Sequence, residues 1–204
     1  IESFFENHEL LSGIHFKHTY SEQPPFKKLK IKIKPEIISI KKNIKKLSNI
    51  KKNYIDPKHL QKMLDDGKEI YLLDTRNKYE INIGTFKNSK NLNILKFEDF
   101  IKKSNELKKL EGEVIMFCTG GIRCEKAQGY LNEKGIHTFK QLKGGIINYL
   151  IETDGKYWDG ECFVFDDRIT LDKELNPTYK NLCPNCQVII NSIDRKNCDC
   201  SIPL

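Results

Sequence analysis

The stretch Val114–Arg123 reads VIMFCTGGIR and decides the fold expected for this chain. Four apolar residues lead into Cys118 and two glycines, and a helix-like segment begins at Cys124. A buried strand of a parallel sheet reads as such an apolar run, and glycines let the loop after it curl without Cβ clashes. The sequence therefore predicts a strand, a glycine-rich loop and a helix, with a cysteine at the end of the strand.

Cys118 is predicted to be a nucleophile. In a curled glycine loop, successive backbone N–H groups and the N-terminus of the following helix point toward the sulfur, and Arg123 adds a positive charge. These features favour the thiolate, whereas a packed structural cysteine would be inert. We therefore expect Cys118, Arg123 and the loop between them to form a reactive site. The loop consists of Thr119, Gly120, Gly121 and Ile122.

Strands and helices alternate along the second half of the chain. Strand-like runs occupy 70–73 and 114–117, and helix-like segments occupy 57–66, 97–104, 124–134 and 146–153. This alternation predicts an α/β fold with a mostly parallel sheet flanked by helices. Ligands of open α/β sheets bind beyond the carboxyl ends of strands, where Asp74 and Cys118 both lie. Trp158, Phe163 and Phe165 are expected to form a packed strand.

The positive charge of the chain is concentrated in one segment. The net charge is +7, yet residues 27–52 carry eleven lysines and one acidic residue, Glu36, whereas the rest of the chain has a net charge of −3. Apolar residues and lysines alternate here, which predicts a strand over 28–33 with a core face and a charged face. The segment is either a solvated surface or a polyanion-binding surface, and the residues alone favour neither. The candidate phosphate contacts are Lys30, Lys32 and Lys34.

Composition excludes several classes of protein. The chain has 204 residues, of which 38% are hydrophobic, enough for one core and a smaller unit. No apolar stretch approaches the roughly 18 residues of a membrane span, and no secretory signal is present. Seven cysteines, an odd number that includes a reactive candidate, argue against a disulfide framework and for a cytoplasmic location. The chain begins with Ile1 and not with methionine, which suggests a fragment or a processed product.

Three motifs together resemble the rhodanese-domain tRNA uridine hydroxylases. The loop from Cys118 to Arg123 resembles the active-site loop of rhodanese domains. Residues 72–80 (LLDTRNKYE) with 83–86 (IGTF) resemble the rhodanese strand and short helix before a glycine turn, and residues 163–168 (FVFDDR) resemble the third motif. The resemblance covers about residues 14–186. It implies conversion of the wobble uridine of tRNA to 5-hydroxyuridine with molecular oxygen, and it favours tRNA, bound at its anticodon region, as the polyanion.

The resemblance also implies roles for residues and domains. Cys118 would accept sulfane sulfur as a persulfide, and Asp74 and Arg76 are further candidate catalytic residues that would lie near the loop, with Asp74 paired to a guanidinium. Glu80 would either hold Arg76 or have a structural role alone. The expected domains are the C-terminal part of a ferredoxin-like α+β unit with a helix over 2–9 and strands over 14–19 and 28–33, a lysine-rich linker, a rhodanese-like domain and a cysteine-rich extension. Their bounds are 1–42, 43–55, 56–160 and 161–204.

Oxygen chemistry needs an electron donor, and the sequence identifies none. It contains no dinucleotide-binding fingerprint and no convincing set of two histidines and a carboxylate. Two hypotheses stay open: Cys118 adds to C6 of uracil and makes C5 electron-rich, or a Cys118 persulfide supplies electrons. Separately from the oxygen chemistry, the cysteine-rich tail is a candidate site for a structural zinc ion, because four of its cysteines have near-typical spacing for a four-thiolate site. They are Cys183, Cys186, Cys198 and Cys200.

Two other functions fit the same residues. A thiosulfate-type sulfurtransferase would use the same Cys118 persulfide but deliver the sulfur to cyanide, a thiol or another protein. A non-catalytic rhodanese-like module would use the fold only to contact RNA or protein, although the intact Cys118 and Arg123 argue against it.

Overall fold

A computed structural model of the chain describes residues 2–14, 16, 18, 20–28, 30–40, 53–110, 112–178, 180–182 and 189–191. Contacts divide the chain into two units, Ile1–Lys30 and Ile31–Leu204. In the first unit the described residues contain the helix α1 (Glu2–Glu6), within the predicted span 2–9. No described residue of 2–40 lies in a strand.

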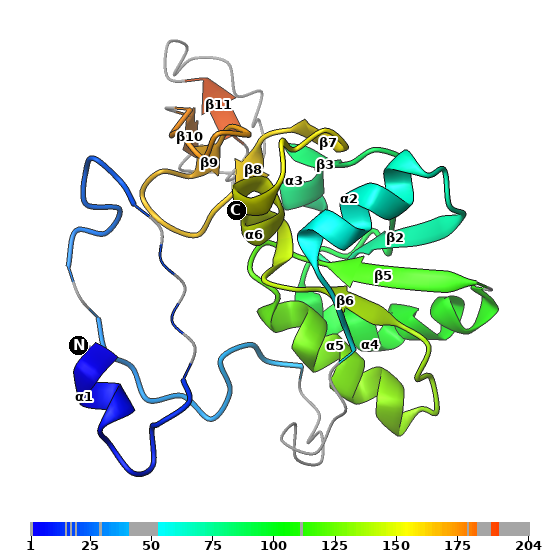
Figure 1. The fold of residues 1–204 in the computed structure, drawn as a ribbon, viewed down its shortest axis with the longest axis horizontal. Helices are drawn as coiled ribbons and strands as arrows, with labels where there is room; N and C mark the ends of the chain where they lie inside the picture. The colour runs from blue at the N-terminus through cyan, green and yellow to red at the C-terminus, as the bar shows by residue number, and fades with distance from the viewer. Residues whose placement is uncertain are drawn as a thin grey trace, which may run out of the picture. The chain divides into compact units, whose positions relative to one another are not determined.

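The centre of the second unit is a five-stranded sheet in which every pair of neighbours is parallel (Figure 1). This confirms the predicted α/β fold with a parallel sheet. The strand order is β1-β6-β5-β2-β4. These strands are β1 (Tyr54–Ile55), β2 (Ile70–Asp74), β4 (Lys90–Asn91), β5 (Glu113–Phe117) and β6 (Lys140–Leu142).

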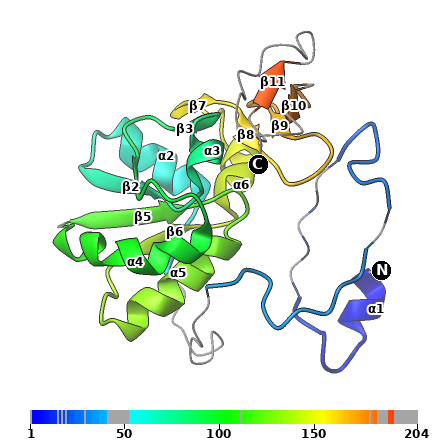
Figure 2. The ribbon, with the colours of Figure 1, turned by 180° about the vertical axis from the view of Figure 1, so that it is seen from behind.

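Helices cover both faces of the sheet, as Figures 1 and 2 show. On one face lie α2 (Pro57–Asp65) and α6 (Gly145–Glu152), and on the other lie η2 (Phe97–Asp99), α4 (Phe100–Lys103), η3 (Ser104–Lys109) and α5 (Ile122–Glu133). The central strand β5 serves both faces, because Ile115 and Phe117 pack with α2 and α6 while Val114 and Met116 pack with α4 and α5. Burial on both sides explains why this strand is a continuous apolar run.

Smaller elements complete the unit. The short helix α3 (Lys78–Ile81) follows β2, and three antiparallel pairs of described strands lie outside the main sheet. The pairs are β3 (Gly84–Phe86) with β7 (Trp158–Gly160), β8 (Cys162–Phe163) with β9 (Thr170–Leu171), and β10 (Lys180–Leu182) with β11 (Ile189–Asn191). Among the described residues, no helix is long and apolar enough to cross a membrane.

The structure corrects several predicted elements. The strands over 28–33 and 14–19 are wrong, because none of their described residues lies in a strand. Ile31 and Ile33 are exposed and have no core to face. The helix over 97–104 is instead η2, α4 and the start of η3. Trp158 and Phe163 lie in β7 and β8, but Phe165 follows β8 and is 63% exposed, so the packed strand does not include it.

The predicted domains stay predictions, but two contacts bear on them. Ile40, which the sequence places in the ferredoxin-like part, is buried in the core cluster that contains residues of α4 and α5, and Glu36 pairs with Lys126 of α5 at 2.8 Å. Tyr54 and Ile55, which the sequence places in the linker, form the edge strand β1. The lysine-rich stretch between them lies largely outside the described residues, and the four tail cysteines lie wholly outside them.

Candidate functional site

Cys118 follows β5 directly and is 1% exposed. It opens the loop 118–121, and Gly121 takes the left-handed conformation, with φ of +93°, at the start of α5. The Gly121 N–H donates to Cys118 Sγ at 3.1 Å. The loop and the first turn of α5 thus direct backbone N–H groups at the sulfur, as predicted, at the carboxyl end of the strand.

The pKa of Cys118 lies below that of an ordinary thiol. The largest cause is a hydrogen bond from the Cys124 thiol; burial opposes the shift, while the positive charge of Arg123 and the backbone N–H groups of Cys124 and Arg123 add to it. The pKa of Cys124 is raised in turn by its burial and by the neighbouring Cys118. Cys118 therefore holds the negative charge of the pair, as a nucleophile must.

Arg123 is fixed by Glu80 and not by a residue of its own helix. Its Nη1 donates to Glu80 Oε1 at 2.5 Å and its Nη2 to Oε2 at 2.6 Å, and the Glu80 side chain is fully buried. Burial opposes the charge on Arg123, but the hydrogen bonds to Glu80 outweigh it and raise the pKa of Arg123. The prediction that Glu80 holds Arg76 is therefore wrong, because its carboxylate is paired with the active-site arginine.

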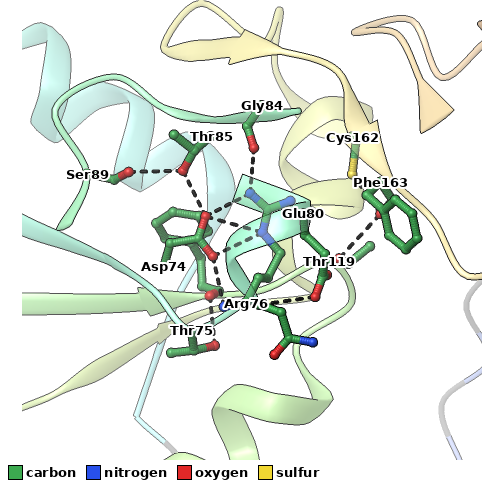
Figure 3. Close-up of polar contacts among 12 residues, drawn as sticks. Asp74, Thr75, Arg76, Glu80, Gly84, Thr85, Ser89, Thr119, Cys162 and Phe163 are labelled. Atoms are coloured by element: carbon green, nitrogen blue, oxygen red, sulfur yellow. Dashed lines mark hydrogen bonds and ion pairs between the residues drawn. The ribbon is translucent and has the colours of Figure 1, made fainter. Parts of the chain in front are cut away.

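Asp74 and Arg76 form a separate ion pair with side chains that are 0% exposed (Figure 3). Arg76 Nη2 donates to Asp74 Oδ2 at 2.7 Å and to the Gly84 carbonyl at 2.6 Å, and Thr85 Oγ1 donates to Asp74 Oδ2 at 2.8 Å. The guanidinium also lies 5.2 Å from the centroid of the Trp158 ring. The pair thus joins β2 to β3 and β7, and the hydrogen bonds of its side chains among the described residues do not reach Cys118.

Sequence reasoning missed how α6 completes the loop. The N–H groups of Ile146 and Ile147 donate to the carbonyls of Cys118 (2.9 Å) and Thr119 (3.2 Å). Gly145 stands at this junction with φ of +71°, and a Cβ there would lie 2.4 Å from the Cys118 oxygen. The predicted glycine turn at Gly144 and Gly145 was the available signal, but sequence alone did not place it against the loop.

We expect Gly145→Ala to displace the loop and to raise the pKa of Cys118, because the new methyl group would overlap the Cys118 carbonyl. The free energy of unfolding should fall by about 2 kcal/mol or more, of which about 1–2 kcal/mol comes from the left-handed backbone alone. Gly135→Ala is the matched control, since Gly135 has φ of +77° with open space around its Cβ position. Denaturant unfolding and the pH dependence of thiolate ultraviolet absorbance measure both effects; equal behaviour of the two variants would contradict the predicted overlap.

The other predicted residues are placed as follows. Thr119 Oγ1 donates to the Phe163 carbonyl at 3.5 Å, and the Ile122 side chain is half exposed. Lys30, Lys32 and Lys34 are exposed and lie in no strand. The zinc ligands Cys183, Cys186, Cys198 and Cys200 are outside the described residues, so the zinc site stays a prediction. Within the described part, no cluster of three or more histidines, cysteines or carboxylates could hold a metal ion.

Several known proteins are similar to this chain. The family model of the rhodanese-like domain matches residues 56–152. The tRNA uridine(34) hydroxylase of Pelagibacter ubique is 43% identical over 87% of this chain and 58% of its own length, and that of Synechococcus elongatus (strain PCC 7942) is 37% identical over 98% and 76%. The crystal structure of thiosulfate sulfurtransferase from Pseudomonas aeruginosa is 19% identical, with a TM-score of 0.44, over 53% of this chain and 20% of its own.

The match at 37% identity covers more than two thirds of the Synechococcus relative. The chain spans less than two thirds of the length of the Pelagibacter relative. The rhodanese match contains the whole loop, Arg123 and its partner Glu80. The chain therefore belongs to the tRNA uridine(34) hydroxylase family, and its second unit carries the rhodanese-like domain of that family.

Proposed function

We propose that this chain hydroxylates the wobble uridine of tRNA to 5-hydroxyuridine, with Cys118 as the reacting nucleophile and molecular oxygen as co-substrate. The observation that carries the proposal is a buried cysteine of lowered pKa inside a nest of N–H groups, beside an arginine held by a buried carboxylate. Curated relatives that align over this loop are named tRNA uridine(34) hydroxylase. The anticodon region is the part of tRNA that contains the wobble base.

Uracil chemistry suits a thiolate at this place. Addition of Cys118 Sγ to C6 of uracil would place negative charge on C5 and its neighbouring carbonyl, which makes C5 reactive toward an electrophile. Insertion of one atom of dioxygen into the C5–H bond leaves the other atom to be reduced to water, which takes two electrons and two protons. Oxidation of two thiols to a disulfide, or of a thiol and a persulfide to a trisulfide, would supply both. Loss of the C5 proton would then release Cys118 Sγ from C6. In the second route Cys118 carries a persulfide, and its sulfane sulfur acts as the reductant. Both routes need the base to be turned out of the anticodon stack.

The reaction belongs in the cytoplasm under this proposal. Cys118, Cys124 and Cys162 are free thiols, and a thiolate nucleophile persists only where thiols are kept reduced.

Mass spectrometry of nucleosides tests the proposal. Unmodified tRNA is incubated with the chain in air, with and without a thiol or persulfide reductant, and digested; 5-hydroxyuridine should form, and its formation should stop when oxygen is removed. The same protein is mixed with thiosulfate and cyanide. Rapid thiocyanate production without 5-hydroxyuridine would replace the proposal by a sulfurtransferase that uses the same cysteine.

Charge on the segment before the rhodanese-like domain is expected to contribute to tRNA binding. Lys30, Lys32 and Lys34 are exposed, so they can approach phosphates without reading sequence. Replacing all three with glutamine should weaken binding and reduce the slope of log affinity against log salt by about one for each phosphate that is no longer neutralised. The matched control replaces three exposed lysines of the rhodanese-like domain, Lys58, Lys68 and Lys87. Titrations at several salt concentrations measure the slope; an equal slope in both variants would show that tRNA docks elsewhere.

A further inference from the structure

Three aromatic rings form a connected row next to the reactive loop, and we refer to Tyr79, Phe163 and Phe165 as the aromatic rim. The rings of Tyr79 and Phe163 are 5.4 Å apart and those of Phe163 and Phe165 are 5.0 Å apart, both edge to face. Phe163 is buried, but Tyr79 and Phe165 expose 41% and 63% of their surface. The buried ring therefore fixes two rings that face solvent.

The aromatic rim contacts the reactive site at two points. Thr119 of the loop donates a hydrogen bond to the Phe163 carbonyl, and these two residues face each other in Figure 3. The Arg123 guanidinium lies 5.6 Å from the centroid of the Phe165 ring, close enough for a cation–π contact. Tyr79 directly precedes Glu80, the carboxylate that holds Arg123. The ion pair between Arg123 and Glu80 thus lies next to both the loop and the aromatic rim.

Cys118 itself is only 1% exposed, so a substrate first meets the residues that surround its loop. The residues that present apolar area beside the loop are Phe165, Tyr79 and Ile122, which is 50% exposed. The ring contacts that connect Tyr79, Phe163 and Phe165 distinguish them from the single exposed apolar residues found on most proteins. With Arg123 against part of the Phe165 ring, the remaining surface of that ring is left for a planar ligand.

We infer that the aromatic rim stacks nucleobases of single-stranded RNA, with Phe165 against the uracil to be modified and Tyr79 against its neighbour. This inference rests on the proposed function and adds the residues that hold the base. Proteins recognise unstacked RNA bases by stacking them on aromatic rings, and successive bases use successive rings. A flat base suits this surface because both outer rings are exposed while their positions are fixed by contacts with Phe163 and Arg123.

The test uses the full chain and a synthetic anticodon stem–loop with a fluorescent pyrimidine analogue at the wobble position. Stacking on a ring should quench the analogue on binding. Phe165→Leu should lose most of the quenching and weaken binding about 10-fold, while Phe165→Tyr, which keeps a ring, should retain both. Tyr79→Leu is compared with Tyr71→Leu, since Tyr71 in β2 has nearly the same exposure, 40%, but lies away from the loop. We expect Tyr79→Leu to weaken binding and Tyr71→Leu to leave it unchanged.

Turnover on tRNA separates this inference from the proposed function. A rise in KM with little change in kcat for Phe165→Leu, and rescue by Phe165→Tyr, would support stacking. Hydroxylation with unchanged KM and unchanged quenching in Phe165→Leu would overturn the aromatic rim while leaving the function intact. Ring-dependent quenching without 5-hydroxyuridine would support the rim and overturn the hydroxylase. Failure of the unmutated chain to bind the stem–loop would overturn the rim.

Discussion

Cys118→Ser is expected to reduce 5-hydroxyuridine formation by about 10³-fold or more, since the loss of a nucleophile removes the reacting group itself. Serine fits the space of the cysteine and can accept the Gly121 N–H, so the loop should stay folded. Its hydroxyl is not ionised near neutral pH, whereas the pKa of Cys118 is lowered by the Cys124 hydrogen bond, by the charge of Arg123 and by the backbone N–H groups at the start of α5. Nucleosides of treated tRNA, measured by mass spectrometry, give the result.

Cys162→Ser provides a matched control for this experiment. Cys162 is buried, and burial raises its pKa to about 12, so it is a neutral thiol under assay conditions. Its replacement should leave activity and the thiolate absorbance at neutral pH unchanged, whereas Cys118→Ser should lose both. In the unmutated chain, lowering the pH through the pKa of Cys118 protonates the sulfur, so the thiolate absorbance should fall as the pH falls. Substantial 5-hydroxyuridine formation by folded Cys118→Ser would refute a nucleophilic role.

The parallel sheet and the reactive loop could be predicted because their causes are local. The run Val114–Phe117 is apolar without a break since β5 is covered on both faces, and Gly121 permits the left-handed backbone from which α5 starts. Strand end, loop and helix start are adjacent in the chain, so no long-range contact is needed to infer them. The same adjacency made Cys118 and Arg123 identifiable together.

Side-chain partners were not predictable in the same way, because they depend on register between distant segments. Glu80 and Arg76 are four residues apart, yet Glu80 reaches Arg123 across 43 positions of sequence while Arg76 turns to Asp74. Phe165 is of a residue type that is common in protein cores. Because β8 ends at Phe163, the Phe165 ring instead lies in solvent beside Arg123. Propensity and alternation describe one strand at a time and carry no information about such pairings.

The strands predicted in the N-terminal segment were wrong for a related reason. Alternation of isoleucine and lysine is necessary for a strand with one buried face, but a strand also needs a partner to bond its backbone. In the described residues Ile31 and Ile33 face solvent, and the first buried isoleucine is Ile40, which belongs to the core cluster that contains residues of α4 and α5. Burial thus begins where the chain reaches the rhodanese-like core and not where its apolar residues begin to alternate.

Asp74→Asn is expected to lower the free energy of unfolding by about 3–5 kcal/mol, the usual cost of leaving one member of a buried ion pair without its partner. Both side chains are 0% exposed, so bulk water cannot replace a lost carboxylate without opening the structure. Domains of this size are stable by about 5–15 kcal/mol, which makes this a large fraction of the total. Denaturant titration of the single variant, with an exposed control such as Asp159→Asn in β7, measures the loss.

The double variant Asp74→Leu with Arg76→Met decides whether the pair is structural or catalytic. Replacing a buried ion pair by apolar side chains of similar size is often nearly neutral, so more than half of the stability lost in Asp74→Asn should return. The hydrogen bonds of this pair lead to Gly84 and Thr85 and so hold β3, whereas the charge beside Cys118 comes from Arg123. The refolded double variant should therefore keep the Cys118 thiolate and form 5-hydroxyuridine. A stable double variant that retains the thiolate but forms no product would place Asp74 or Arg76 in the reaction itself, because a group needed only for folding is not required for activity once the fold is restored.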